Sequence, residues 1–277
     1  MNAPDELFHD KFGLWWTNFP SLPNEKVGCI GMLAPEDLEL LSAAEDRLRE
    51  AGCTTAIGPI DGNTWSKHRA VIKSEGRPPF MLEPFTPPEI ARGFQDMGYS
   101  ILAQYSSSII PLDQDEPQYR KIASRMDKAG VGIRQLNLDN VTSELQKIFQ
   151  LSLKTFTENF LYTPISEDEF LAMYQPLAPL LTPESAFIAE RDGKPVGFVF
   201  GYQQGDTMIV KTLAVLPERI LAGLGTLLVH QIQQSAKERG CTSAIHALQR
   251  EDNQSLRISK RFSATVFRRY ALFSKSL

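Results

Sequence analysis

One stretch, residues 210–249, constrains the fold of this chain more than any other. It opens with an apolar run that ends at Pro217, turns through Gly223 and Gly225, and continues as a helical pattern to Gly240, where a second apolar run begins. This order predicts strand, turn, helix and strand. Glycines let the backbone approach a ligand closely, and the free N–H groups at a helix start favour an anion such as a pyrophosphate. If only the glycine turn is considered, the alternative to an anion-binding site is an ordinary tight turn.

The composition sets limits on the class of protein. With 277 residues, 42% hydrophobic and 22% charged, the chain fits one large or two ordinary globular domains. A net charge of −4 gives no reason to expect nucleic acid or a membrane as a partner. No apolar run could span a bilayer and the first residues lack a secretory pattern, so we expect a cytoplasmic location. The widely spaced Cys29, Cys53 and Cys241 indicate free thiols and no metal site.

Strand and helix patterns alternate along the chain. In the first half, strand patterns at 27–33 and 54–60 flank a helix that starts at Pro35. The second half ends in a strand predicted at 266–273. These patterns predict an α/β (α+β) fold.

The boundary between the halves is predicted from polarity. The most polar, turn-like stretch covers residues 113–117, and a helical pattern follows it. We therefore place the boundary within 113–131, which gives domains 1–125 and 126–277.

An internal repeat links the two halves. Residues 50–57 read EAGCTTAI and residues 238–245 read ERGCTSAI, so six of eight positions are identical at a separation of 188 residues. Each copy ends an amphipathic helix and opens a strand, and each is followed by a short predicted helix, at 64–69 and at 255–260. We infer a duplication, with chance similarity over eight residues as the alternative.

The two copies differ at the start of the shared helix. At the same separation, Gly223 falls on Pro35 and Gly225 on Asp37. Proline offers no N–H group, and the carboxylates of Glu36 and Asp37 would cap the helix and repel a phosphate. We therefore expect an anion to bind only in the second unit.

The second half resembles the GCN5-related N-acetyltransferase (GNAT) family over about residues 132–277. The motifs that carry the resemblance are Leu213-Ala214-Val215-Leu216-Pro217, Gly223-Leu224-Gly225-Thr226 and Asn253-Gln254-Ser255-Leu256-Arg257. The first half resembles the same fold from its fourth strand onward. The resemblance implies two tandem GNAT-like units, each a mixed, mostly antiparallel sheet flanked by helices, of which the N-terminal unit is degenerate.

In this family, acyl-CoA enters between two splayed strands. The resemblance implies acetyl-CoA, or another acyl-CoA, as co-substrate, with its pantetheine on the first splayed strand and its pyrophosphate on the glycine turn. The implied contacts lie on the strand, in the turn and at the start of the next helix: Leu213, Ala214 and Val215; Arg219, Ala222, Gly223, Leu224, Gly225 and Thr226; Asn253 and Ser255.

Three positions depart from the family pattern. The basic or amide residue expected three positions before Gly223 is Ile220, with Arg219 beside it. A carboxylate common in the preceding strand is replaced by Lys211, and the tyrosine often used as general acid falls on Ser259. The resemblance therefore supports cofactor binding better than it supports the usual acid and base.

Acyl transfer to an amine needs a base for the ammonium and an acid for the leaving thiolate. His246 is the candidate base, since imidazole titrates near neutral pH; a core histidine is the alternative. Tyr270 is a candidate acid, and Lys211 a candidate for orienting substrate or thioester. For Tyr270 the alternative is a role in packing, and for Lys211 the alternative is an ordinary surface lysine. His68 and Tyr162 are further candidates for substrate contacts.

The sequence thus predicts an acyl-CoA-dependent N-acyltransferase that moves an acetyl group to a small-molecule or peptide amine by direct attack. Two alternatives stay open: a non-catalytic acyl-CoA sensor or interaction module, and a different acyl-thioester reaction such as decarboxylation. Neither the acceptor nor the oligomeric state follows from the sequence.

Overall fold

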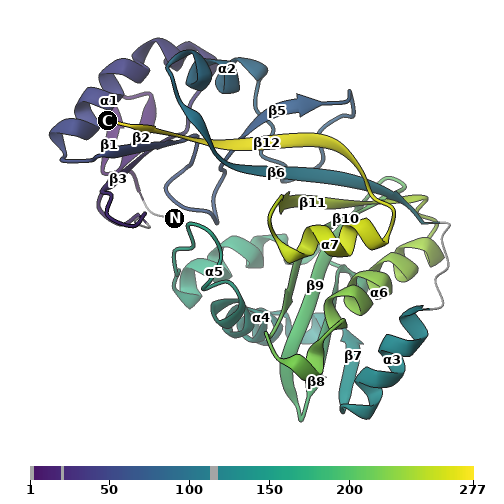
Figure 1. Ribbon diagram of the computed structural model, residues 1–277. Helices are drawn as coiled ribbons and strands as arrows, with labels where there is room; N and C mark the ends of the chain where they lie inside the picture. Colours follow the sequence, from purple (N-terminus) through teal and green to yellow (C-terminus); the bar gives the residue numbers. More distant parts are fainter. Residues whose placement is uncertain (1–2, 20–21, 113–117) are drawn as a thin grey trace. The chain divides into compact units, whose positions relative to one another are not determined.

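The computed structural model describes residues 3–19, 22–112 and 118–277, which form two compact units (Figure 1). Unit 1 comprises Met1–Ser106, Asn159–Thr163 and Phe267–Leu277, and unit 2 comprises Ser107–Glu158 and Pro164–Val266. Within the described residues, we find no helix with the length and apolar character needed to cross a membrane.

These packing units differ from the domains 1–125 and 126–277 that we inferred from the sequence. The chain changes unit inside strand β6 (Ser100–Pro111) and again inside strand β12 (Thr265–Ser276). Helix α3 (Gln118–Lys128) therefore belongs to unit 2. The polar stretch 113–117 lies outside the described residues, and the functional boundary stays a prediction.

Unit 1 is a mixed sheet with its helices packed on an apolar cluster. Its strand order is β1-β2-β3-β4-β12-β6, and β5 also pairs with β12. The cluster includes Phe12, Ile30, Leu41, Phe94 and Phe273, all at most 1% exposed. The new elements are β1 (Glu6–Phe8), β2 (Phe12–Trp15), β3 (Val27–Gly31), η1 (Pro35–Leu40), α1 (Leu41–Glu50), β4 (Thr55–Gly58), β5 (Ala70–Ser74) and α2 (Pro88–Asp96).

A buried ion pair fixes the C-terminal strand in unit 1. The Arg268 guanidinium on β12 donates to both carboxylate oxygens of Glu83 at 2.7 Å, and both side chains are fully buried. Tyr270, also on β12, donates its hydroxyl to the same carboxylate. A buried charge needs such partners, because desolvation of an unpaired ion costs several kcal/mol.

Unit 2 has the strand order β6-β11-β10-β9-β8-β7, with α4 and α6 on the two sides of β9 (Figure 1). The fold is thus mixed α/β with a mostly antiparallel sheet and flanking helices, as the sequence predicted. The new elements are β7 (Val131–Gln135), η2 (Leu138–Asn140), α4 (Val141–Thr155), α5 (Glu167–Tyr174), η3 (Gln175–Leu180), η4 (Pro183–Ser185), β8 (Ala186–Arg191), β9 (Lys194–Gln204), β10 (Thr207–Val215), η5 (Arg219–Leu221), α6 (Leu224–Glu238), β11 (Ser243–Arg250) and α7 (Gln254–Arg261).

The repeated octapeptide has the same backbone geometry in both units. Gly52 and Gly240 both end a helix with positive φ, 81° and 88°, a conformation that favours glycine. The N–H of Cys53 then donates to Leu48 at 2.9 Å, and the N–H of Cys241 donates to Ala236 at 3.0 Å. These matching bonds agree with the inferred duplication.

The strands that follow the repeat also pair alike. The parallel pair β3/β4 aligns Val27 with Thr55, and the parallel pair β10/β11 aligns Thr207 with Ser243. Thr55 and Ser243 are themselves equivalent positions of the repeat, so each unit contains one β-α-β element in the same register.

One helix that supported the repeat argument is absent. Residues 64–69 are not helical, whereas α7 forms as predicted. The carboxamide oxygen of Asn63 accepts the N–H groups of Trp65 and Ser66, and this local turn replaces the helix.

Replacing Gly240 with alanine tests the shared helix end. A Cβ at Gly240 meets no atom within 4 Å, so the cost comes from the backbone conformation alone. We expect Gly240→Ala to lower the free energy of unfolding by about 1 kcal/mol in urea titrations. Gly132→Ala is the control, since its Cβ also meets open space and its φ is not positive. Equal stability of the two variants would contradict this reading.

Candidate functional site

The parallel strands of unit 2 stop pairing before either strand ends. Their register runs from Thr207/Ser243 to Val210/His246, yet β10 continues to Val215 and β11 to Arg250. On its other side, β10 stays paired with β9 as far as Val215. The end of β10 is therefore paired with β9 along one edge and is no longer paired with β11 along the other.

A bulge in β10 marks the start of this divergence. The β9 register shifts between Val210 and Thr212, so Lys211 is the extra residue. Beyond it, the N–H of Leu216 donates to Val196 on β9 at 2.9 Å. Because successive peptide groups alternate in direction along a strand, the N–H and C=O groups of Leu213 and Val215 point to the β11 side. Their peptide groups form the edge available to an added partner.

Strand β11 bends away at Leu248. Its φ of 59° is uncommon for a residue with a Cβ, and its N–H donates to the Ser107 hydroxyl on β6 at 3.3 Å. The repeat makes Ile60 its counterpart in unit 1, where the N–H donates to Ile30 on β3 at 2.9 Å. The equivalent amide thus keeps the strands together in unit 1 and turns away in unit 2.

Further contacts close the same region of unit 1. The Asp61 carboxylate accepts the N–H of Met32 at 2.6 Å, and a Cβ at Gly31 would overlap the Ile60 carbonyl. At the helix start, the buried Asp37 carboxylate accepts the N–H of Ala34 at 2.8 Å. Of the two acids predicted to cap this helix, Asp37 therefore accepts an N–H group at the helix start.

Two glycines shape the turn of unit 2, Gly223 through its backbone conformation and Gly225 through close packing. Gly223 has a φ of 91° and directly precedes α6. A Cβ at Gly225 would lie 3.3 Å from Ile258 on α7 and 3.4 Å from Leu213 on β10. The first turn of α6 therefore lies close to both neighbours, with N–H groups that have no acceptor within the helix.

Three arginines from different elements lie by this turn. Arg125 on α3 donates to the Ala222 carbonyl, and Arg261 at the end of α7 donates to the Thr226 hydroxyl at 3.4 Å. Arg219 lies in η5, beside the exposed Ile220. Sequence reasoning found Arg219 but missed Arg125 and Arg261, because both lie outside the turn motif.

The remaining predicted cofactor contacts belong to the same unit. Ala214 is buried in β10, and Leu224 is fully buried at the start of α6. Asn253 is exposed just before α7. Ser255 is in α7, but its side chain lies outside the described part of the chain. Binding by these residues stays a prediction.

His246 is held in a chain of buried hydrogen bonds. The Gln233 amide nitrogen on α6 lies 2.9 Å from Nε2, and the Ser259 hydroxyl on α7 lies 2.7 Å from Nδ1. Ser259 in turn donates to Gln249 at 2.6 Å. The amide fixes the tautomer, with Nε2 accepting and Nδ1 donating. Full burial lowers the pKa of His246 to about 3, so the ring is neutral at pH 7.

The three predicted catalytic side chains are divided between the units. His246 and the partly buried Lys211 lie in unit 2. Tyr270 is fully buried in unit 1, where its hydroxyl donates to Glu83. The predicted roles of all three remain to be tested.

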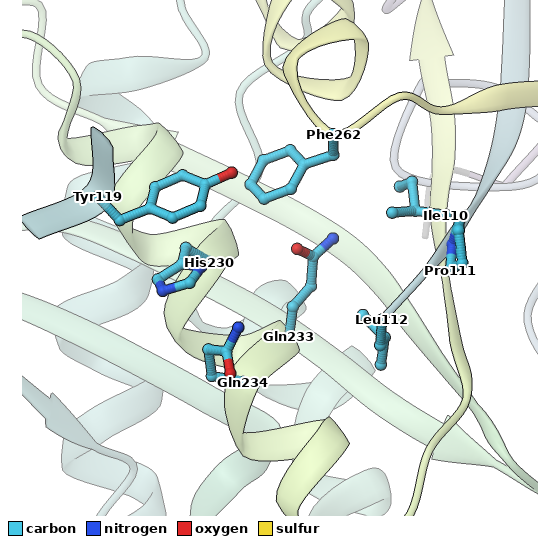
Figure 2. A pocket seen from close by; sticks show the side chains of 8 residues that line it. All are labelled: Ile110, Pro111, Leu112, Tyr119, His230, Gln233, Gln234 and Phe262. Carbon is cyan, nitrogen blue, oxygen red and sulfur yellow. The ribbon is translucent and has the colours of Figure 1, made fainter. Parts of the chain in front are cut away.

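A small cavity lies beside this network, between the end of β6, α3, α6 and Phe262, which directly follows α7 (Figure 2). The Tyr119 ring stacks on His230 with centroids 3.8 Å apart and lies 5.6 Å from the Phe262 ring. These contacts attach α3 to unit 2. No group of three His, Cys, Asp or Glu side chains that could hold a metal occurs among the residues with a described position.

The comparisons identify the class of protein to which this site belongs. The model of the acetyltransferase (GNAT) family matches residues 145–258, so the second half of the chain carries a GNAT-family domain. This fold supports acyl-CoA-dependent acyltransferase activity in general, with acyl-CoA as co-substrate.

Solved structures agree on the fold. A GCN5-related N-acetyltransferase from Sphaerobacter thermophilus superposes with a TM-score of 0.56 at 15% identity, over 90% of this chain and 73% of that one. A tandem GNAT protein from the clavulanic acid biosynthesis pathway gives 0.53 at 12% identity, over 90% and 75%. Tandem GNAT-like architecture is thus the fold of this chain.

Two curated relatives are each 26% identical to parts of the chain. One is a bacterial ceramide synthase from Caulobacter vibrioides, matched over 181 residues, or 62% of this chain and 46% of the relative. The other is protein YghO from Escherichia coli, matched over 166 residues, or 58% of this chain and 42% of the relative. The matched region spans less than half the length of either relative.

The buried histidine makes stability depend on pH. A folded-state pKa near 3 against an unfolded value near 6.5 means that the unfolded chain binds more protons between these limits. Stability from the neutral ring is present above pH 6.5 and is lost as pH falls towards 3. Relative to His246→Gln, the wild type should lose about 2 kcal/mol of unfolding free energy between pH 7 and pH 5 in urea titrations. Parallel pH profiles would show that His246 titrates normally.

Removal of the Tyr270 hydroxyl separates packing from catalysis. We expect Tyr270→Phe to lower the free energy of unfolding by about 1 kcal/mol, because Glu83 loses one donor, and to leave kcat unchanged. A fall in kcat with unchanged stability would instead support the predicted role as general acid.

Proposed function

We propose that unit 2 is an acyl-CoA-dependent N-acyltransferase whose donor lies along the free edge of β10. The observation that carries this proposal is the divergence of β10 from β11 directly beside a glycine turn at a helix start. Pantetheine amides can pair with the peptide groups of Leu213 and Val215 as an added strand would. The pyrophosphate then meets the N–H groups of the first turn of α6.

The proposed reaction is direct attack. The ammonium first gives up a proton to solvent. The neutral amine nitrogen then forms a bond to the thioester carbonyl carbon, the C–S bond breaks, and the leaving thiolate takes up the proton that the attacking nitrogen loses as it becomes an amide. In this proposal, the N–H of Leu213 donates to the thioester oxygen and stabilises its developing negative charge.

We assign His246 a positioning role. With a pKa of about 3 it is a weak proton acceptor at pH 7, and both ring nitrogens already have partners. Through Gln233 and Ser259 it connects α6, β11 and α7. These elements surround the proposed donor site, so His246 would hold their spacing.

The acceptor we propose is a long-chain amine. Ceramide is the N-acyl amide of a long-chain amino alcohol, and a relative at 26% identity is named a ceramide synthase. Acyl-CoA donors with longer chains are therefore compared with acetyl-CoA, the donor that the sequence predicts.

The test combines donors and acceptors on the full chain. Thiol release is measured with acetyl-, octanoyl- and palmitoyl-CoA, each with sphinganine or a short amine. We expect amine-dependent release, with the long amine preferred. Binding of CoA without release from any pair would favour a sensor, and amine-independent release would favour another thioester reaction.

A matched pair of variants tests the donor site. Gly225→Ala and Gly225→Asp add the same Cβ beside Ile258 and Leu213, but only the aspartate adds a negative charge at the proposed pyrophosphate. We expect the aspartate to weaken CoA binding roughly tenfold more than the alanine by calorimetry. Equal affinities would place the pyrophosphate elsewhere.

A further inference from the structure

Helix α3 supplies a positive charge to the glycine turn from outside the residues that match the family. Arg125 lies 20 residues before the matched region starts, and it donates through Nη2 to the Ala222 carbonyl. A Cβ at Gly223 would lie 2.9 Å from the same nitrogen. The guanidinium is therefore in contact with the turn itself.

Packing fixes the position of this arginine. Tyr119, Ile122 and Met126 form the buried face of α3 on the core of unit 2. Tyr119 stacks on His230 of α6 and lies close to Phe262, as Figure 2 shows. Arg125 precedes Met126 and remains exposed at the edge of this face. Helix α3 therefore packs on unit 2 along its length, and Arg125 is the cationic residue of this helix that contacts the glycine turn.

The charges around the turn favour a polyanion. Arg219 and Arg261 add two more cations from η5 and α7. The nearby carboxylate of Glu218 is paired with Arg191 at 2.8 Å. Asp127, on α3 itself, is exposed. An arginine presents five N–H donors, so the bond to Ala222 leaves others for two phosphate oxygens.

We propose that Arg125 binds the pyrophosphate of the CoA donor and replaces the basic residue that is missing at Ile220. This inference rests on the proposed function, because it assigns a further binding residue to the same site. It also means that the donor site includes a helix placed before the GNAT-family domain, so a fragment starting at residue 126 would lack part of it.

The test compares two arginines of one helix in the full chain. Arg125→Ala removes the proposed contact. Arg120→Ala removes an equal, exposed charge about 140° around the helix. Calorimetry is performed with CoA, 4′-phosphopantetheine and pantetheine. We expect Arg125→Ala to raise the Kd for CoA about tenfold and to leave that for pantetheine unchanged. Arg120→Ala should match the wild type, and Arg125→Lys should recover part of the loss.

Different failures are distinguishable. Equal CoA affinity of the two alanine variants and the wild type would overturn the role of Arg125 alone. An equal loss for CoA and pantetheine would also overturn it, because a contact to phosphate cannot weaken a ligand that has none. No CoA binding by the wild type would overturn both this inference and the proposed function.

Discussion

The two units differ in the direction of one backbone N–H group. In unit 1 the N–H of Ile60 donates to Ile30 and keeps the parallel strands together. In unit 2 the equivalent Leu248 takes a φ of 59° and donates to Ser107 on β6. A left-handed leucine is strained, and the bond to β6 offsets part of that cost. The free edge of β10 depends on this bend.

The rest of the site is consistent with that difference. Where the strands diverge, α6 begins directly after Gly223, and Arg125, Arg219 and Arg261 lie by the turn. Where the strands stay together, Asp37 caps the helix start. In our proposal, the copy in unit 2 binds an anionic ligand at this helix start, whereas in unit 1 the Asp37 carboxylate accepts the N–H of Ala34 at the equivalent position.

Local features were predictable from the sequence, and distant contacts were not. The β-α-β order, the glycine turn and the capping role of Asp37 follow from spacing and residue type. The packing of β12 in unit 1, the burial of His246 and the position of Arg125 depend on residues far away in the chain. The false helix at 64–69 arose because the side chain of Asn63 competes locally for backbone N–H groups.

Amide hydrogen exchange with and without CoA tests directly whether unit 2 alone binds the donor, because it measures both units in one experiment. If the donor lies along β10 and the glycine turn, CoA will slow exchange in peptides covering residues 211–227 of unit 2. Peptides covering residues 30–40, the equivalent region of unit 1, will exchange at an unchanged rate. Protection at 30–40, or none at 211–227, would contradict this position of the donor.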